Sequence, residues 1–194
     1  MPLLGMQSKF KDGLPIPTQV FWSAVKTNNV GEQTIFNSQK TADSLQQDLL
    51  QSAEPEVLSR FIKMRDEKKN HQLVRSAEQA KIALSEAEQC QAALNYIEDS
   101  LSCPLTRQQF SHTVKDHVAA ITKLIDEVIA QAECQPDLIY ITGGAAKSQI
   151  IRQAIEDKLE GIEVVDGDHF GSVTKGLTVW AERWFSECGG KAVP

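Results

Sequence analysis

The chain has 194 residues, a formal net charge of -6 and 24% charged residues. This length is sufficient for one hydrophobic core, or for one core with a small appended subdomain. The acidic balance and the lack of any Lys/Arg-rich run exclude non-specific nucleic-acid binding as a leading function. No apolar run approaches about 20 residues, so the sequence predicts no membrane span. The first residues lack the basic-then-apolar order of a secretory signal, and we expect a cytoplasmic protein.

The initial segment, residues 1–40, is rich in structure breakers, with prolines or glycines at positions 2, 5, 15 and 17. Residues 20–25 fit either a strand or one helical turn, and residues 34–36 fit a short extended piece. Because no clear first strand or helix precedes this segment, we expect the chain to begin inside a larger protein.

Residues 41–105 predict a helical subdomain with a short hairpin. One helix begins at Thr41, and a second begins at Pro55, where a missing N–H costs nothing in the first turn. A charged, solvated connection is expected next, and a further helix follows it. The predicted ranges are 65–70 for the connection, 71–88 for the helix, and 91–98 with 101–103 for the hairpin.

Residues 106–188 predict an α/β subdomain, followed by a frayed tail at 189–194. A capping box at Thr106 opens a long amphipathic helix that extends to about Ala132. Its continuation alternates strand and helix, which is the pattern of an α/β fold. The expected order is a strand at 138–141, a glycine pair, a helix at 148–160, a strand at 161–165 and a last helix from Ser172.

The glycine pair Gly143-Gly144 directly follows an apolar run that has the profile of a fully buried, parallel strand. At the carboxyl end of such a strand, bare backbone N–H groups allow a phosphate or a nucleoside to approach. The competing interpretation is a tight turn that needs only a positive φ. The sequence has neither a G-x-G-x-x-G fingerprint nor a Walker lysine, so neither a dinucleotide fold nor a P-loop is indicated.

A second candidate is the helix at 71–88, where Glu78, Lys81 and Ser85 share one face. By composition alone this face is an ordinary solvated surface. The histidines at 71, 112, 117 and 169 are dispersed, and the four cysteines lack metal-ligand spacing. We therefore expect free thiols, no metal ligands and no catalytic residues in this chain.

Taken together, these separated stretches resemble the DnaK-type heat-shock chaperones of the actin-like ATPase family. Glu78-x-x-Lys81-x-x-Leu84-Ser85 is similar to that family's adenosine-contacting helix. Leu105-Thr-Arg-Gln-Gln-Phe110, a long helix and Ile139-Tyr-Ile-Thr-Gly-Gly-Ala-Ala-Lys147 follow in the family's order. Ser172-Val-Thr-Lys-Gly176 resembles the start of its closing helix. The resemblance covers about residues 70–185, and the detailed pattern is most similar to the YegD-type group.

The resemblance implies an α/β fold, namely an incomplete lobe II of an actin-like (ribonuclease H-like) ATPase domain with a helical and hairpin subdomain. In this family ATP or ADP, with Mg²⁺, lies in a cleft between two lobes. The residues implied to face the adenine and ribose are Glu78, Lys81, Ile82 and Ser85. Gly143 and Gly144 are implied to pass under the nucleoside, and Ala145 and Lys147 are implied to be further cofactor-binding positions.

The family's two phosphate motifs are missing from this sequence. We therefore expect a fragment that starts after the second motif and hydrolyses no ATP by itself. Its implied partners are the missing N-terminal lobe of the same protein and a client or co-chaperone protein, with no nucleic acid and no membrane. In the intact parent the cofactor would be ATP or ADP with Mg²⁺, and the fragment itself would require none.

The sequence departs from the family pattern at three places. Ile82 stands where the family has an arginine that stacks on adenine, Ala145-Ala146-Lys147 replaces Ser-Thr-Arg, and Phe170 stands near a family aspartate. These departures leave two alternatives open. One is a protein-interaction module with a vestigial nucleotide cleft, in which the acidic helices at 41–88 bind a client. The other is a lobe of a sugar or acid kinase of the same superfamily.

Overall fold

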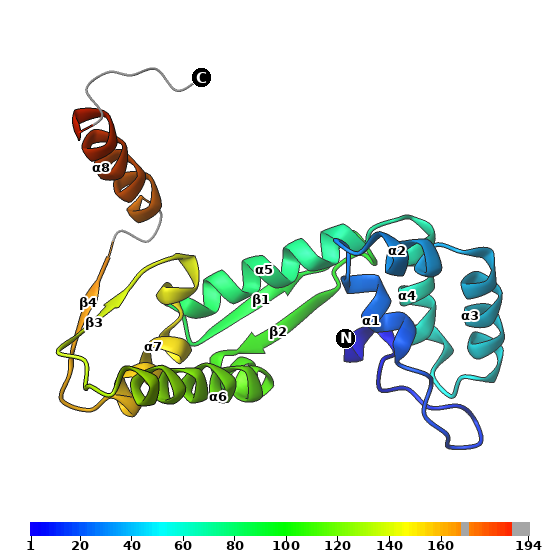
Figure 1. Cartoon of the computed structure of the whole chain (residues 1–194). Helices are drawn as coiled ribbons and strands as arrows, with labels where there is room; N and C mark the ends of the chain where they lie inside the picture. The colour runs from blue at the N-terminus through cyan, green and yellow to red at the C-terminus, as the bar shows by residue number, and fades with distance from the viewer. Residues whose placement is uncertain (168–170, 188–194) are drawn as a thin grey trace. The chain divides into compact units, whose positions relative to one another are not determined.

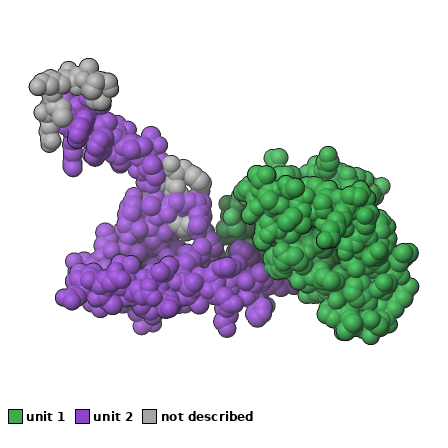
Figure 2. All heavy atoms as spheres, turned by 45° about the vertical axis from the view of Figure 1, so that its right-hand side comes forward, with its two compact units in different colours: residues 1–107 green, residues 108–194 purple. Residues whose placement is uncertain are grey.

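The computed structural model describes residues 1–167 and 171–187, and it divides the chain into two compact units (Figure 2). Unit 1 comprises residues 1–107 and unit 2 comprises residues 108–194. The initial segment and the helical subdomain expected from the sequence both belong to unit 1. The expected boundary between these two parts at 40/41 stays a prediction. The expected boundary between the helical and the α/β subdomain at 105/106 stays a prediction as well. The expected role of Phe170 and the expected frayed tail at 189–194 lie outside the described residues.

Helices dominate unit 1, and its sheet is a single hairpin (Figure 1). For residues 20–25 the sequence fitted either a strand or one helical turn, and the structure has a helix there. The elements in chain order are η1 (Pro2–Leu4), α1 (Gln19–Val25), α2 (Val30–Phe36), α3 (Gln39–Gln51), α4 (Pro55–Asp66), α5 (Asn70–Glu86), β1 (Gln89–Ala93) and β2 (Ser102–Thr106).

The expectation of an extended piece at 34–36 was wrong, because these residues form the last turn of α2. The side chain of Asn29 accepts a hydrogen bond from the backbone N–H of Glu32 at 3.0 Å. This is a helix N-cap, and it satisfies one of the donors that a helix start leaves unpaired. The helix that it starts carries Phe36 into the core, where its side chain is fully buried.

The core of unit 1 is centred on α4, which begins at Pro55 as predicted. Its apolar face supplies Leu58, Phe61, Ile62 and Met64, all buried. The ring of Phe61 packs between two others, with centroids 4.3 Å from Phe21 and 6.0 Å from Phe36. The initial segment therefore contributes to the same core as α4, since Phe21 comes from α1.

The stretch 65–70, which the sequence predicted to be a charged, solvated connection, is not uniformly solvated, and its two ends belong to α4 and α5. Arg65 is 7% exposed and Asn70 is 3% exposed. Both side chains satisfy backbone carbonyls of the initial segment, since Arg65 Nε donates to Phe36 O at 2.9 Å and Asn70 Nδ2 donates to Ala24 O at 3.1 Å. Buried polar groups of this kind require such partners.

The predicted hairpin is present, and β1 pairs antiparallel with β2, with Cys90 opposite Leu105. Its connection is longer than expected, because the strands end at Ala93 and begin again at Ser102. Leu94 and Ile97 in this connection are buried in the core of unit 1. A backbone hydrogen bond from Leu94 N to Leu101 O, 2.9 Å long, closes it. This explains the imperfect alternation of apolar residues in the sequence.

Unit 2 follows the predicted order of helix, strand, glycine turn, helix, strand and helix. β3 and β4 pair in parallel, with Tyr140 opposite Val165, which confirms the predicted parallel strand. The elements are α6 (Arg107–Ala132), β3 (Leu138–Ile141), η2 (Gly144–Lys147), α7 (Gln149–Lys158), β4 (Glu163–Asp166) and α8 (Ser172–Glu187). Among the described residues, no helix is long and apolar enough to cross a membrane.

The prediction that β3 is fully buried was wrong. Leu138 is 50% exposed and Tyr140 is 58% exposed, whereas Ile141 is 8% exposed. Successive side chains of a strand point to opposite faces, so one face of β3 is open to solvent. In the described part of the chain this sheet consists of β3 and β4 alone. A strand with a buried profile in the sequence is therefore covered on only one side.

Candidate functional site

The first set of candidate residues lies on one face of α5. Spacings of three and four residues place Glu78, Lys81, Ile82 and Ser85 together on this face. The opposite face carries Ala80 and Leu84, which are buried. Because α5 packs on β1 through its buried face, the candidate side chains of Glu78, Lys81 and Ile82 are exposed.

Charges on this face are not paired with each other. Within the described residues, neither Glu78 nor Lys81 takes part in a salt bridge, although their i, i+3 spacing would allow one. Ser85 is half-buried, and its hydroxyl donates to the backbone carbonyl of Lys81 at 3.3 Å. Ile82 is an isolated aliphatic side chain between them, 60% exposed. The face thus offers one carboxylate, one ammonium and one apolar contact.

The second set forms the turn after β3. Gly143 has φ 93° and ψ 161°, a conformation that is essentially restricted to glycine. No described atom lies within 4 Å of a Cβ built on Gly143, so the turn is open above this residue. Gly144, Ala145 and Lys147 follow in η2, and Ser148 N–H donates to Ala145 O at 3.0 Å. The prediction of a positive φ at this turn is confirmed.

Two hydroxyl groups that the sequence analysis did not single out flank this turn. Thr142 Oγ1 and Ser172 Oγ are 2.7 Å apart and share a hydrogen bond. They join the residue before Gly143 to the first residue of α8. The sequence signal for them was weak, because a hydroxyl residue before a glycine pair and one at a helix start are both common.

The structure brings together the residues within each set. The α5 set belongs to unit 1, and the turn set belongs to unit 2.

Among the described residues, no group of three or more His, Cys, Asp or Glu could hold a metal ion. Cys90, Cys103 and Cys134 are free, and Cys188 lies outside the described residues.

A βα unit with a glycine turn at the carboxyl end of a parallel strand defines a class of α/β proteins that bind ligands at this edge. The model of the family described as Hsp70 protein matches residues 53–178 of this chain, which is well over half of it. The chain therefore belongs to the Hsp70 family. Both sets of candidate residues lie within the matched range. The resemblance to heat-shock chaperones that the sequence indicated is confirmed at the level of the family.

Proposed function

We propose that this chain supplies the adenosine side of the ATP/ADP-binding cleft of a heat-shock-chaperone-like ATPase. It would correspond to most of lobe II of the nucleotide-binding domain, in the YegD-type group. Members of the Hsp70 family generally bind ATP or ADP with Mg²⁺. A cytoplasmic location is part of the same proposal and depends on the sequence signals.

The observation that carries the proposal is the open glycine turn after β3, where no described atom lies within 4 Å of a Cβ built on Gly143. A carboxylate such as that of Glu78 accepts hydrogen bonds from ribose hydroxyls, and the ammonium of Lys81 donates them. Ile82 supports an apolar contact with a base. At Gly143 the lack of a side chain lets a flat ring approach the backbone. These residue types therefore fit a nucleoside.

The phosphate end of the ligand would be held elsewhere in the protein. In this proposal Mg²⁺ is bound through the phosphates of the nucleotide. The ion would neutralise charge on the transferring phosphoryl group. We propose that this chain alone positions the nucleoside and does not hydrolyse ATP.

Exposed apolar faces in unit 2 support a partner within the same domain. Leu138 and Tyr140 leave one face of β3 open, and α8 carries a stripe of exposed side chains at helical spacing. The stripe consists of Val173, Leu177, Trp180 and Trp184, each 48% exposed or more. Extended apolar surfaces of this kind mark sites of association. We propose that another lobe of the nucleotide-binding domain covers them.

An NMR titration with ADP and Mg²⁺ tests the proposal in the chain as it is. We expect the amide signals of Gly143–Gly144 to shift, with a dissociation constant on the order of 1 mM. The amide signals of Glu78–Ser85 are followed in the same titration, and we expect them to shift as well. If neither set shifts at saturating ADP, the proposed function is wrong.

Matched lysine variants give the control. Lys81→Ala should weaken the response several-fold, because it removes a donor to the ribose. Lys40→Ala changes an exposed lysine on α3 and should leave the response unchanged. If Lys81→Ala and the wild type bind ADP with equal affinity, the result favours the rival function described next.

The rival function is a protein-interaction module with a vestigial cleft. Trp22, Val30 and Ile35 on α1 and α2 are 52%, 82% and 62% exposed. Exposed aromatic and aliphatic side chains favour protein partners, and the Hsp70 family typically interacts with clients and co-chaperones. Trp22→Ala would abolish client binding under this rival and would leave the ADP response untouched.

A further inference from the structure

The ring of Tyr140 on β3 lies directly over the backbone of Gly167, just after β4. A Cβ built on Gly167 would lie 2.2 Å from Tyr140 Oη, 2.3 Å from Cζ and 2.7 Å from Cε1. These distances are far inside van der Waals contact. A side chain at position 167 would therefore displace the ring of Tyr140 from this position.

A side chain at position 167 is opposed by this ring and not by the backbone. The glycines with a positive φ are, among the described residues, Gly5, Gly13, Gly143 and Gly161. Gly167 is not one of them, so its backbone would accept alanine without strain. Its N–H donates to Ile141 O at 2.8 Å, which continues the strand pairing one residue beyond Asp166. The contact thus holds the last residue of β3.

Packing does not fix the position of Gly143 in the turn that follows β3, because no described atom lies within 4 Å of a Cβ built on it. The two residues just before Gly143 are held by hydrogen bonds. Ile141 is held by the N–H of Gly167, and Thr142 by the hydroxyl of Ser172 at 2.7 Å.

We propose that Tyr140 and Gly167 form a positioning contact that fixes the end of β3, and with it the turn at Gly143-Gly144. The role of this turn in binding a nucleoside rests on the proposed function. Neither residue touches the ligand in this scheme. The ring covers Gly167, the N–H of Gly167 holds Ile141, and Ile141 sets the direction in which the chain enters the turn.

Hydrogen exchange of single amides tests the contact without any ligand. The variants are Gly167→Ala, Tyr140→Ala, Tyr140→Phe and the double variant Tyr140→Ala/Gly167→Ala. Gly176→Ala is the matched control, because a Cβ at this helical glycine meets no described atom within 4 Å. The reporting amides are those of residue 167 and of Ser148, which donate to Ile141 O and Ala145 O.

We expect Gly167→Ala and Tyr140→Ala each to speed the exchange of both reporting amides about tenfold. The double variant should match Tyr140→Ala, because the added methyl group then meets no ring. Tyr140→Phe and Gly176→Ala should match the wild type. The amides of Leu159 in unit 2 and Leu94 in unit 1 should stay unchanged in every variant.

Additive effects in the double variant would overturn the proposal, because they would mean that ring and methyl group act separately. Acceleration that includes Leu159 would overturn it as well, because it would indicate general loosening of unit 2. The ADP titration separates this inference from the proposed function. A wild type that fails to respond to ADP refutes the function, whereas unchanged exchange in Gly167→Ala refutes the positioning contact alone.

Discussion

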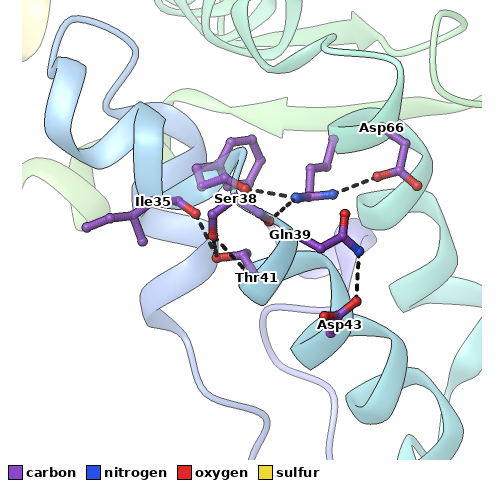
Figure 3. A network of polar contacts seen from close by, with 8 residues as sticks. Ile35, Ser38, Gln39, Thr41, Asp43 and Asp66 are labelled. Carbon is purple, nitrogen blue, oxygen red and sulfur yellow. Dashed lines mark hydrogen bonds and ion pairs between the residues drawn. The ribbon is translucent and has the colours of Figure 1, made fainter.

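Arg65 Nε donates a hydrogen bond to the backbone carbonyl of Phe36 at 2.9 Å, and the guanidinium lies 5.9 Å from the centre of the Phe36 ring. The same group donates from Nη2 to Ser38 O at 2.8 Å and pairs through Nη1 with Asp66 (Figure 3). One buried side chain therefore ties the end of α4 to the corner between α2 and α3. Nearby, Ser38 Oγ caps the start of α3 by accepting from Thr41 N at 3.3 Å, and Thr41 Oγ1 donates to Ile35 O near the end of α2 at 2.7 Å.

The first prediction concerns this arginine. Arg65→Ala should lower the free energy of unfolding by about 3 kcal/mol, because two carbonyls lose their donor in a buried position. Arg65→Lys should recover only part of the loss, since an ammonium cannot reproduce the planar fork. Urea unfolding measures both. Arg75→Ala, at an exposed position on α5, serves as the control. A loss for Arg65→Ala no larger than that of the control would contradict the structural role.

The second prediction concerns Asp48 on α3. Partial burial raises the pKa of its carboxyl above the ordinary value of 3.8. Because the pKa is raised in the folded state, the protonated carboxyl of Asp48 favours folding. This contribution to stability is fully present below the ordinary pKa and is lost as pH rises through the pKa of the folded state. Asp48→Asn should therefore stabilise the protein at neutral pH, and the gain should vanish in acid. Thermal unfolding at several pH values checks this. A gain that is independent of pH would point to another cause.

The third prediction concerns Arg60 and Glu98, which join α4 to the hairpin connection. Hydrogen bonds from Arg60, 2.5 Å and 3.2 Å long, lower the pKa of Glu98 below its ordinary value of 4.5. The pair therefore stabilises the folded state above this value, and its contribution is lost as pH falls through the folded pKa. Arg60→Gln should reduce stability at neutral pH and have no effect once Glu98 is protonated. Glu98→Gln should give the same dependence of stability on pH. If either variant is still less stable than the wild type in acid, the Arg60–Glu98 pair is not the source of the lost stability.

The fourth prediction concerns the backbone at Gly143. Gly143→Ala should cost about 1–3 kcal/mol, because φ 93° with ψ 161° is a conformation that side chains rarely adopt. The cost is conformational, since no described atom crowds the Cβ position. Gly143→Val should therefore cost only slightly more than Gly143→Ala. A much larger loss for valine would show that the turn is packed and not open.

Local signals in the sequence predicted much of this fold. Pro55 marked the start of α4, the spacing of apolar residues marked α3 to α8, and β3 was placed at Leu138–Ile141 as the structure has it. The mistakes at residues 34–36 and at Arg65 share one cause. The sequence shows the chemical type of a residue, whereas a cap or a buried partner depends on which segment folds against it.

The candidate site also has features that the sequence predicted and features that only the tertiary structure shows. The face formed by Glu78, Lys81, Ile82 and Ser85 follows from helical periodicity alone, and the positive φ at Gly143 follows from the glycine pair after a strand. Thr142 beside Ser172, and Tyr140 over Gly167, could not be read from the sequence, because they join residues far apart in the chain. They exist only once β3 and β4 pair in this register.

The sequence by itself determined the order of helices and strands from α3 to α8, the glycine turn and membership of the Hsp70 family, because these depend on local residue types and on motifs in a fixed order. The tertiary structure alone decided what is buried. It buried Arg65 and Leu94 in unit 1 and left Leu138 and Tyr140 of β3 exposed. Burial is set by the segments that pack around a residue, and those segments come from distant parts of the chain.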